Sequence, residues 1–364
     1  MTDFNQIASS NLSLPADSYI YSLITLSKRL ESSVLAPGSP IAVISSDDSL
    51  RIFDADLNLL PDGIYENIHN SITCVSRFDD DGNIIATAGR DACVKLWDRR
   101  TKSKVAEFVT PKKEALSALN CCASNNAIVA GTELKDDGPG ESPIFLWDTR
   151  KGGSPQLQYV ESHTDTITEL RFNSSTNPTH LLSGSTDGLI NLFDLSQDNE
   201  DDALFQVINN KSAIHHTGFL TSTSVYTLST DEKWTQYEIR NPDEEDSSHN
   251  PEESLDLRER LGCEYVIKVV DAGDAKWVAI GQHRQSYSRL NFAGAHGNEI
   301  VRDVLVDAST IYSCGEDGHI RAWKASSTGE AMETEGTEKA SKDKKKKHRK
   351  KDKEAGKEAR FAPY

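Results

Sequence analysis

The sequence lacks a long apolar segment. Among its 364 residues there is no run of eighteen apolar residues, and the amino-terminal region has no apolar core of the signal-peptide kind. These absences exclude a membrane-spanning helix and a secretory leader. We therefore expect a soluble intracellular protein with no membrane partner.

Spaced cysteine pairs are also missing. None of the six cysteines belongs to a C-x-x-C motif, although zinc sites need spaced pairs and disulfides need an oxidising compartment. Glycine-rich nucleotide loops, metal-binding histidine pairs and EF-hand spacing are absent as well. We expect buried thiols, with redox sensitivity left open only for the adjacent Cys121 and Cys122. No catalytic residue, metal, cofactor or small-molecule substrate is expected.

Basic residues are scarce over most of the chain. The sequence has 40 Lys and Arg against 57 Asp and Glu, a formal net charge of −17. Residues 325–364 hold 12 basic and 8 acidic residues, so residues 1–324 hold 28 and 49, a net charge of −21. A surface of this sign repels nucleic acid and attracts basic proteins. We therefore expect basic protein partners for this part of the chain.

The cationic residues gather between Lys342 and Lys353, in a Ser, Gly, Glu and Ala context that cannot bury a core. We predict a disordered basic tail over residues 325–364. Such blocks are typical of import signals, nucleolar addresses or RNA contacts, and the simplest alternative is a solubilising tail. We predict a nuclear protein, with the nucleolus as a second address, a cytoplasmic fraction, and an import receptor or RNA on the tail. The candidate localisation residues are Lys342, Lys344, Lys345, Lys346, Lys347, Arg349, Lys350, Lys351 and Lys353.

A short phrase recurs along residues 1–324. In Ala88–Asp98, Ser183–Asp194 and Ser313–Lys324, small residues precede a turn Asp, and an aromatic residue follows six positions later. Weaker copies fill the gaps, and the stretch Trp277–Phe292 is accepted as a repeat on its position. The unit resembles a WD-type repeat of roughly 40–45 residues. We predict an all-β, seven-bladed WD-type β-propeller.

A propeller ring has to close, because an open sheet edge leaves backbone groups unpaired. The last repeat supplies three candidate strands, and residues 18–26 form a β-rich run in which Tyr19, Tyr21 and Leu23 alternate against Ile20 and Ile24. We predict that residues 18–26 complete the last blade. The expected domains are a flexible segment 1–17, a propeller 18–324 and the tail 325–364.

Polar residues recur at fixed distances from each turn Asp. A hydroxyl lies four positions before it and a His about twenty-two positions before it. The pattern resembles the buried tetrad of WD repeats, in which Trp donates to the hydroxyl, the hydroxyl to His and His to Asp. Its repetition favours a structural role over a Ser-His-Asp hydrolase triad. The predicted tetrad residues are His69, Thr87, Asp91, Trp97, His163, Ser183, Asp187, His296, Ser313, Asp317 and Trp323.

A resemblance to one particular family of WD-repeat proteins covers most of the ring, with the similar segments in the same order along the chain. The segments Gly131–Asp137, Phe145–Arg150, Glu161–Phe172 and Asp198–Leu204 resemble the WD repeat-containing protein 89 family. This resemblance implies a scaffold-like propeller and supplies no catalytic residues.

Two repeats end in Trp-Asp-x-Arg, which places Asp98 with Arg100 and Asp148 with Arg150. The pattern resembles the box of propellers that serve as substrate receptors of cullin-RING ubiquitin ligases, in which Asp and Arg contact the adaptor. A bidentate Arg and carboxylate pair can form such a rigid contact surface. The alternative is a local ion pair within each repeat.

Acidic clusters follow the fourth and fifth repeats, in loops at the rim of the ring. The candidate contacts for a basic partner are Asp201, Asp202, Asp243, Glu244, Glu245 and Asp246. We therefore predict a non-catalytic interaction scaffold in the nucleus or nucleolus, an assembly factor or chaperone for a basic client such as a ribosomal protein. The alternative function is a cullin-RING substrate receptor.

Overall fold

The computed structural model describes residues 2–26, 39–135, 140–173, 180–240, 254–271, 276–281, 290–291, 295–307 and 309–325. The chain divides into residues 1–326 and residues 327–364, and the second unit lies outside the described residues. The predicted disorder of the tail and the predicted role of its basic block are therefore not addressed by the described structure.

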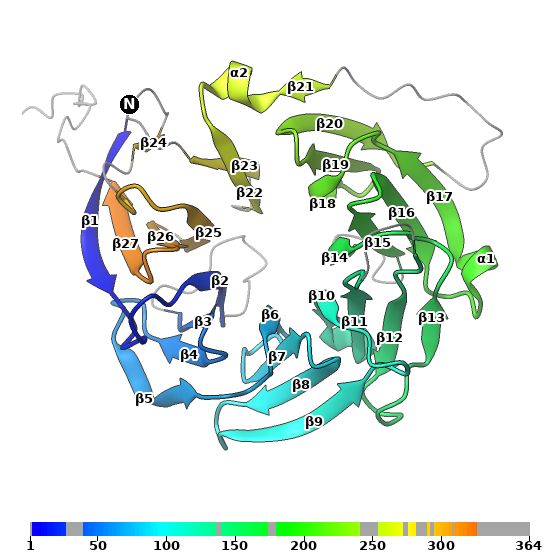
Figure 1. The fold of residues 1–364 in the computed structure, drawn as a ribbon, viewed down its shortest axis with the longest axis horizontal. Coiled ribbons are helices and arrows are strands. Elements are labelled where there is room, and N and C mark those ends of the chain that lie inside the picture. The colour runs from blue at the N-terminus through cyan, green and yellow to red at the C-terminus, as the bar shows by residue number, and fades with distance from the viewer. Residues whose placement is uncertain are drawn as a thin grey trace, which may run out of the picture. The chain divides into compact units, whose positions relative to one another are not determined.

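Antiparallel sheets stand around a central axis, each with its first strand near the axis and its last strand at the rim (Figure 1). Each sheet is a blade of a β-propeller. The middle strands are buried on both faces because every blade packs between two neighbours; all five residues of Ile41–Ser45 are buried, for example. This position in the fold accounts for the small and apolar residues of these strands.

The first three blades each contain four consecutive strands. Blade 1 has β2 (Ile20–Thr25), β3 (Ile41–Ser45), β4 (Leu50–Phe53) and β5 (Leu59–Tyr65). Blade 2 has β6 (Ile72–Arg77), β7 (Ile84–Gly89), β8 (Cys93–Asp98) and β9 (Ser103–Val109). Blade 3 has β10 (Leu116–Cys122), the 3-10 turn η1 (Ala123–Asn125), β11 (Ala127–Thr132), β12 (Ile144–Asp148) and β13 (Leu157–Tyr159).

The next two blades each include one short helix beside their strands. Blade 4 has β14 (Ile167–Phe172), β15 (His180–Ser185), β16 (Leu189–Asp194), α1 (Glu200–Ala203) and β17 (Leu204–Asn209). Blade 5 has β18 (Ile214–Thr221), β19 (Ser224–Ser229), β20 (Lys233–Glu238) and β21 (Leu255–Asp256), and α2 (Leu257–Leu261) follows it.

The prediction of seven blades is wrong, because the described residues form six. After blade 5, β22 (Tyr265–Asp271) and β23 (Lys276–Gly281) make only a two-stranded sheet. The next described strand, β24 (Leu290–Asn291), does not extend that sheet and pairs in parallel with β1 (Thr2–Ser10). We assigned Trp277–Phe292 to one repeat because of its position in the sequence. Its two described strands, β23 and β24, instead belong to two different sheets.

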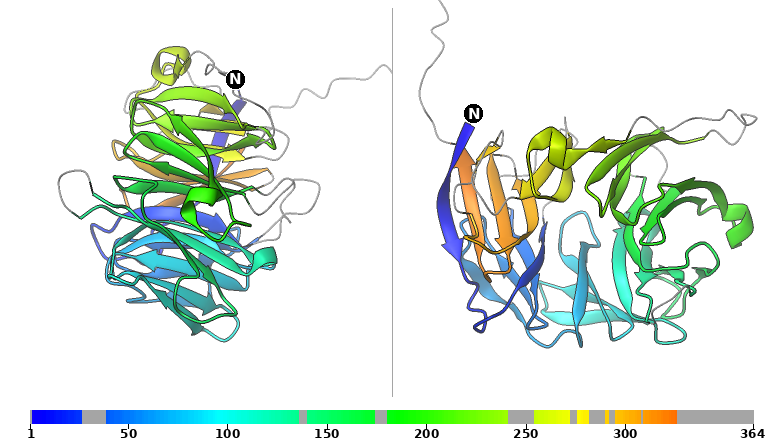
Figure 2. Two further views of the ribbon diagram at one scale, coloured as in Figure 1. Left: turned by 90° about the vertical axis from the view of Figure 1, so that its right-hand side faces the viewer. Right: turned by 45° about the horizontal axis from the view of Figure 1, so that its top comes forward.

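The predicted ring closure is also wrong in its residues. Blade 6 contains β25 (Val301–Asp307), β26 (Thr310–Gly315) and β27 (Ile320–Ala325), and the strand that pairs with β27 is β1. Residues 20–25, which we expected there, instead form β2, the inner strand of blade 1. Residues 2–10, which we expected to be part of a flexible segment, thus form a paired strand. Figure 2 shows β1 running along β27.

Hydroxyl side chains join the inner strands of successive blades. Thr73 donates to the carbonyl of Leu116 at 2.7 Å, and Ser117 donates to that of Ile167 at 2.6 Å. Thr168 continues the series with a 2.9 Å hydrogen bond to the carbonyl of Ile214. Because the three hydroxyls follow the first residue of their strands, the same link is repeated from blade 2 to blade 5.

Candidate functional site

Blade 2 contains a complete four-residue network. The indole of Trp97 donates to Thr87 Oγ1 at 2.9 Å, and Nε2 of His69 lies 2.8 Å from the same oxygen. Nδ1 of His69 lies 2.8 Å from Asp91, which also accepts from Lys95 at 3.0 Å. The network joins the loop before β6 to β7, β8 and the turn between them, so that every polar group in it has a partner.

Blade 6 repeats the arrangement. Trp323 donates to Ser313 at 2.9 Å, His296 Nε2 lies 2.9 Å from that hydroxyl, and His296 Nδ1 lies 2.7 Å from Asp317. Arg321 adds a 2.6 Å ion pair to Asp317. Burial alone would raise the pKa of Asp317, but the hydrogen bond and charge of His296 and the hydrogen bond from Arg321 lower it to about 2.

In blade 4 the network has no tryptophan. His163 lies 2.7 Å from Ser183 and 3.0 Å from Asp187, while the amide of Asn191 approaches His163 Nε2 at 3.2 Å. Ser183 is fully buried, so its hydroxyl cannot reach a substrate in solution. The phenyl ring of Phe193 stacks on Tyr159 with ring centroids 4.5 Å apart. This Ser-His-Asp set therefore contributes packing and polar satisfaction.

A further network, in blade 1, escaped the sequence analysis. Asp47 accepts from Ser45 at 2.7 Å and from Ser49 at 2.6 Å, and it forms a 2.7 Å ion pair with Arg51. The Arg51 guanidinium also donates to the carbonyl of Leu12, which ties the segment after β1 to blade 1. The missed signal was the Ser-x-Asp-x-Ser-x-Arg spacing, in which Arg51 lies four positions after Asp47, as Lys95 lies four after Asp91 and Arg321 four after Asp317.

The two Trp-Asp-x-Arg boxes have the same geometry. Asp98 accepts from Arg100 at 3.0 and 2.7 Å, and Asp148 accepts from Arg150 at 2.9 and 2.7 Å. Hydrogen bonds from Arg100 lower the pKa of Asp98 to about 2, and those from Arg150 hold the pKa of Asp148 well below its usual range. Each box is thus a bidentate ion pair that closes its own turn.

Charged residues on four strands form a cluster that the sequence analysis did not anticipate. On β14, Glu169 lies 3.1 Å from Arg171 and 2.6 Å from His216 of β18. On β25, Asp303 forms an ion pair with Lys268 of β22. Inner-strand charges within otherwise apolar runs were the available signal. Because these charges neutralise one another across neighbouring strands, the cluster links blades together.

Exposed acidic residues lie on the face formed by the turns after the first and third strands of each blade. Asp201 and Asp202, two of the candidate partner contacts, are exposed on α1, whereas Asp243, Glu244, Glu245 and Asp246 lie outside the described residues. Asp56, Asp80 and Asp81, which the sequence analysis missed, are exposed in such turns as well. Within the described part of the chain, none of these five exposed aspartates forms an ion pair.

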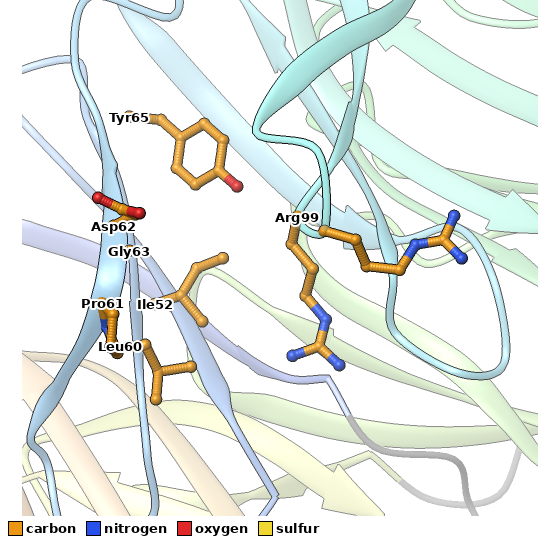
Figure 3. Close-up of a pocket in the computed structure, with 8 residues that line it drawn as sticks. Ile52, Leu60, Pro61, Asp62, Gly63, Tyr65 and Arg99 are labelled. Carbon is orange, nitrogen blue, oxygen red and sulfur yellow. The ribbon is translucent and has the colours of Figure 1, made fainter.

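A shallow groove separates the outer strand of blade 1 from blade 2. Ile52, Leu60, Pro61, Asp62, Gly63, Tyr65, Arg99 and Arg100 line it (Figure 3). Residues from β4 and β5 form one side, and the turn between β8 and β9 supplies the two arginines of the other side. Its volume is about 200 Å³. No sequence motif indicates this groove, because it exists only where two blades meet.

Among the described residues, no helix is long and apolar enough to cross a membrane. The same residues include no group of three or more His, Cys, Asp or Glu side chains arranged to hold a metal ion.

Radial four-stranded blades, two of which contain a buried Trp-hydroxyl-His-Asp network, define a WD-type β-propeller. The family model "WD domain, G-beta repeat" matches residues 65–98 and 154–194. An uncharacterized WD repeat-containing protein of Schizosaccharomyces pombe is 31% identical over 290 residues, which cover 71% of this chain and 83% of that protein. The chain therefore belongs to the WD repeat-containing proteins, a class that acts through protein interactions.

Two further relatives extend this comparison. An uncharacterized WD repeat-containing protein of Saccharomyces cerevisiae is 33% identical over 263 residues, 67% of this chain but only 64% of that protein. The WD repeat-containing protein 89 homolog of Dictyostelium discoideum is 26% identical over 196 residues, 43% of this chain and 52% of that protein. The resemblance to that family found in the sequence thus recurs among the relatives.

Proposed function

We propose that this protein is a non-catalytic nuclear or nucleolar scaffold that holds a basic client, such as a ribosomal protein, during assembly. The observation that carries the proposal is the set of exposed aspartates on one face, Asp56, Asp80, Asp81, Asp201 and Asp202. These carboxylates form no ion pair with the described residues, so their negative charge remains available to attract a basic protein and to speed its encounter.

Rigid presentation is the mechanism we propose. The networks in blades 2, 4 and 6 hold the strands of each blade to the loops of the opposite face, so the acidic side chains stand on a rigid ring and keep their spacing when a client binds. A basic client that would otherwise associate with RNA could be shielded on such a surface. The basic block Lys342–Lys353 would direct the protein to the nucleus, through an import receptor or RNA contacts.

Charge removal on opposite faces tests the client-binding part. The variant Asp80→Asn, Asp81→Asn, Asp201→Asn should bind purified core histones, used as a basic probe, at least tenfold more weakly than the wild type. The matched control Glu66→Gln, Glu161→Gln, Glu299→Gln removes three exposed carboxylates from the loops of the opposite face and should bind normally. Binding should weaken as salt rises, since screening shortens the reach of surface charges. Equal losses in both variants would contradict a directed surface.

Truncation tests the localisation part. A chain ending at Ala325 should lose nuclear enrichment yet bind the histone probe as the full chain does. Nuclear enrichment of the truncated protein would contradict the proposed role of the tail. If the truncated ring bound RNA as well as the full chain does, the proposal that the acidic ring repels RNA would be contradicted.

The cullin-RING alternative rests on Arg100 and Arg150, whose side chains are 63% and 65% exposed. Both guanidiniums are already engaged by Asp98 and Asp148, which favours the local ion pair. The double variant Arg100→Glu, Arg150→Glu should fold and should abolish co-purification of the ligase adaptor if the boxes bind it. Unchanged adaptor capture, or none from the wild type, removes this alternative.

A further inference from the structure

The groove between blades 1 and 2 combines an apolar floor with a cationic side. Ile52, Leu60 and Pro61 supply apolar surface, and Arg99 lies on the opposite side of the same space (Figure 3). The ring of Tyr65 is directed across the groove toward Arg99, so that its hydroxyl can meet a ligand there. At the groove's edge, Asp62 forms a 3.1 Å ion pair with Lys102, and Arg100 is paired with Asp98, which among the described residues leaves Arg99 as the uncompensated charge of the opposite side.

Arg99 is the residue that sets this groove apart. Its Nε is buried and has no hydrogen-bond partner within the described residues. Leaving a buried donor unsatisfied costs free energy, and the cost is larger for a charged group. No ion pair among the described residues involves Arg99 either, so an acceptor brought by a ligand would meet an uncompensated guanidinium. The adjacent carboxylate of Asp98 does not compensate for the charge of Arg99, because it already accepts two hydrogen bonds from Arg100.

The chain contains its own comparison for this residue. The turns after β8 and β12 have the same Asp and Arg geometry, but the residue between them is Arg99 in blade 2 and Thr149 in blade 3. The turn therefore does not require an arginine at this position. A guanidinium that the local structure does not need is available for recognition.

The size of the groove limits the kind of ligand. Pockets for small molecules usually occupy about 300–1,000 Å³ and enclose most of the ligand. At about 200 Å³ this groove is smaller, and it is open along the outer surface between two blades. It can accept one large side chain and its neighbour in a peptide, with the rest of the peptide lying on the surface.

We propose that this groove docks a short linear peptide in which a large apolar side chain stands next to an Asp or Glu. The apolar side chain lies against Ile52, Leu60 and Pro61, and the carboxylate accepts hydrogen bonds from Arg99 and from the Tyr65 hydroxyl. A planar guanidinium is suited to bidentate contact with a carboxylate. This groove binds a negatively charged peptide, whereas the exposed aspartates attract a positively charged client. It is therefore a second docking surface that does not depend on the proposed client function.

The test begins with a phage-displayed library of random heptapeptides selected on the full chain. Enriched peptides should pair a Leu, Ile, Phe or Met with an Asp or Glu within two positions. One enriched peptide, synthesised with a fluorescent label, is then titrated by fluorescence anisotropy. Arg99→Thr, which copies the blade 3 turn, should raise its Kd at least tenfold, and Arg99→Lys should raise it less because the charge remains.

A matched control separates this site from general surface charge. Lys151→Thr removes one exposed positive charge from the equivalent turn of blade 3 and should leave the Kd unchanged. Enrichment of peptides that lack acidic residues would overturn the proposal. So would an equal Kd for wild type and Arg99→Thr, or an equal rise in Kd for Arg99→Thr and Lys151→Thr.

Discussion

Ser22 donates a hydrogen bond of 2.8 Å to Oδ2 of Asp303, although 281 positions separate the two residues in the sequence. The backbone amide of Leu23 donates to the same oxygen at 2.8 Å. These bonds join the inner strand of blade 1 to the inner strand of blade 6. The ring is therefore closed near its axis by Asp303 as well as at its rim by β1.

Asp303→Asn should weaken this closure. The change removes the negative charge that pairs with Lys268 and leaves an amide nitrogen facing donors. We expect a loss of about 2–3 kcal/mol in the free energy of unfolding, measured by urea titration. The control Asp56→Asn alters an exposed aspartate and should change stability by less than about 0.5 kcal/mol. Equal stability of the two variants would show that closure does not depend on Asp303.

The outer closure can be tested by two changes on β1. Phe4 packs against the cluster that contains Val304 and Trp323, whereas Ile7 is 47% exposed. Phe4→Ala should lower the free energy of unfolding by about 2 kcal/mol, and Ile7→Ala by less than about 0.5 kcal/mol. Thermal unfolding monitored by circular dichroism would check this. Identical melting curves for both variants would contradict the pairing of β1 with blade 6.

Two tryptophans should respond differently to the same substitution. The indole of Trp97 donates to Thr87 at 2.9 Å, whereas the buried Nε1 of Trp147 has no hydrogen-bond partner in the part of the chain that the structure describes. Both Trp→Phe changes remove similar volume, but only Trp97→Phe breaks a hydrogen bond, which is partly buried. We expect Trp97→Phe to cost about 1–2 kcal/mol more than Trp147→Phe in denaturant unfolding. Equal costs would mean that the Trp97 bond contributes nothing.

Acid should weaken the ring through its tetrad aspartates. Burial opposes ionisation of Asp91 and Asp317, but hydrogen bonds and charge from their His and basic partners lower the pKa of each to about 2. An unfolded Asp titrates near about 3.9, so these carboxylates stabilise the folded state above about pH 4. This stabilisation is lost as the pH falls from about 4 toward 2. Urea midpoints between pH 5 and pH 2.5 should fall more steeply for the wild type than for Asp317→Asn.

The sequence predicts the networks well because each residue has a fixed place in a repeat. His69, Thr87, Asp91 and Trp97 could be related by spacing alone, since one repeat brings them together. Ring closure is different, because it depends on which distant strand pairs with β27. Residues 18–26 have the clearer alternation, but Thr2–Ser10 makes the pairing, and only the structure distinguishes them.

Sites formed between blades could not be predicted in the same way. The groove needs Leu60 of blade 1 and Arg99 of blade 2 to lie together, and no periodicity relates these two positions. Likewise, Glu169 and His216 meet because their inner strands are neighbours in the ring. The number of blades also depended on pairing, because β24 joins β1 and does not extend the sheet of β22 and β23.

The partnership of β1 with β27 has a consequence during protein synthesis. Roughly 300 residues separate the two strands, and at about 5–20 residues per second the ribosome needs about 15–60 s to make them. For most of that interval β1 has left the ribosome while the strand it pairs with does not yet exist. An unpaired strand of this kind can join other sheets. The nascent chain should therefore depend on a chaperone that binds β1 until translation has passed Ala325.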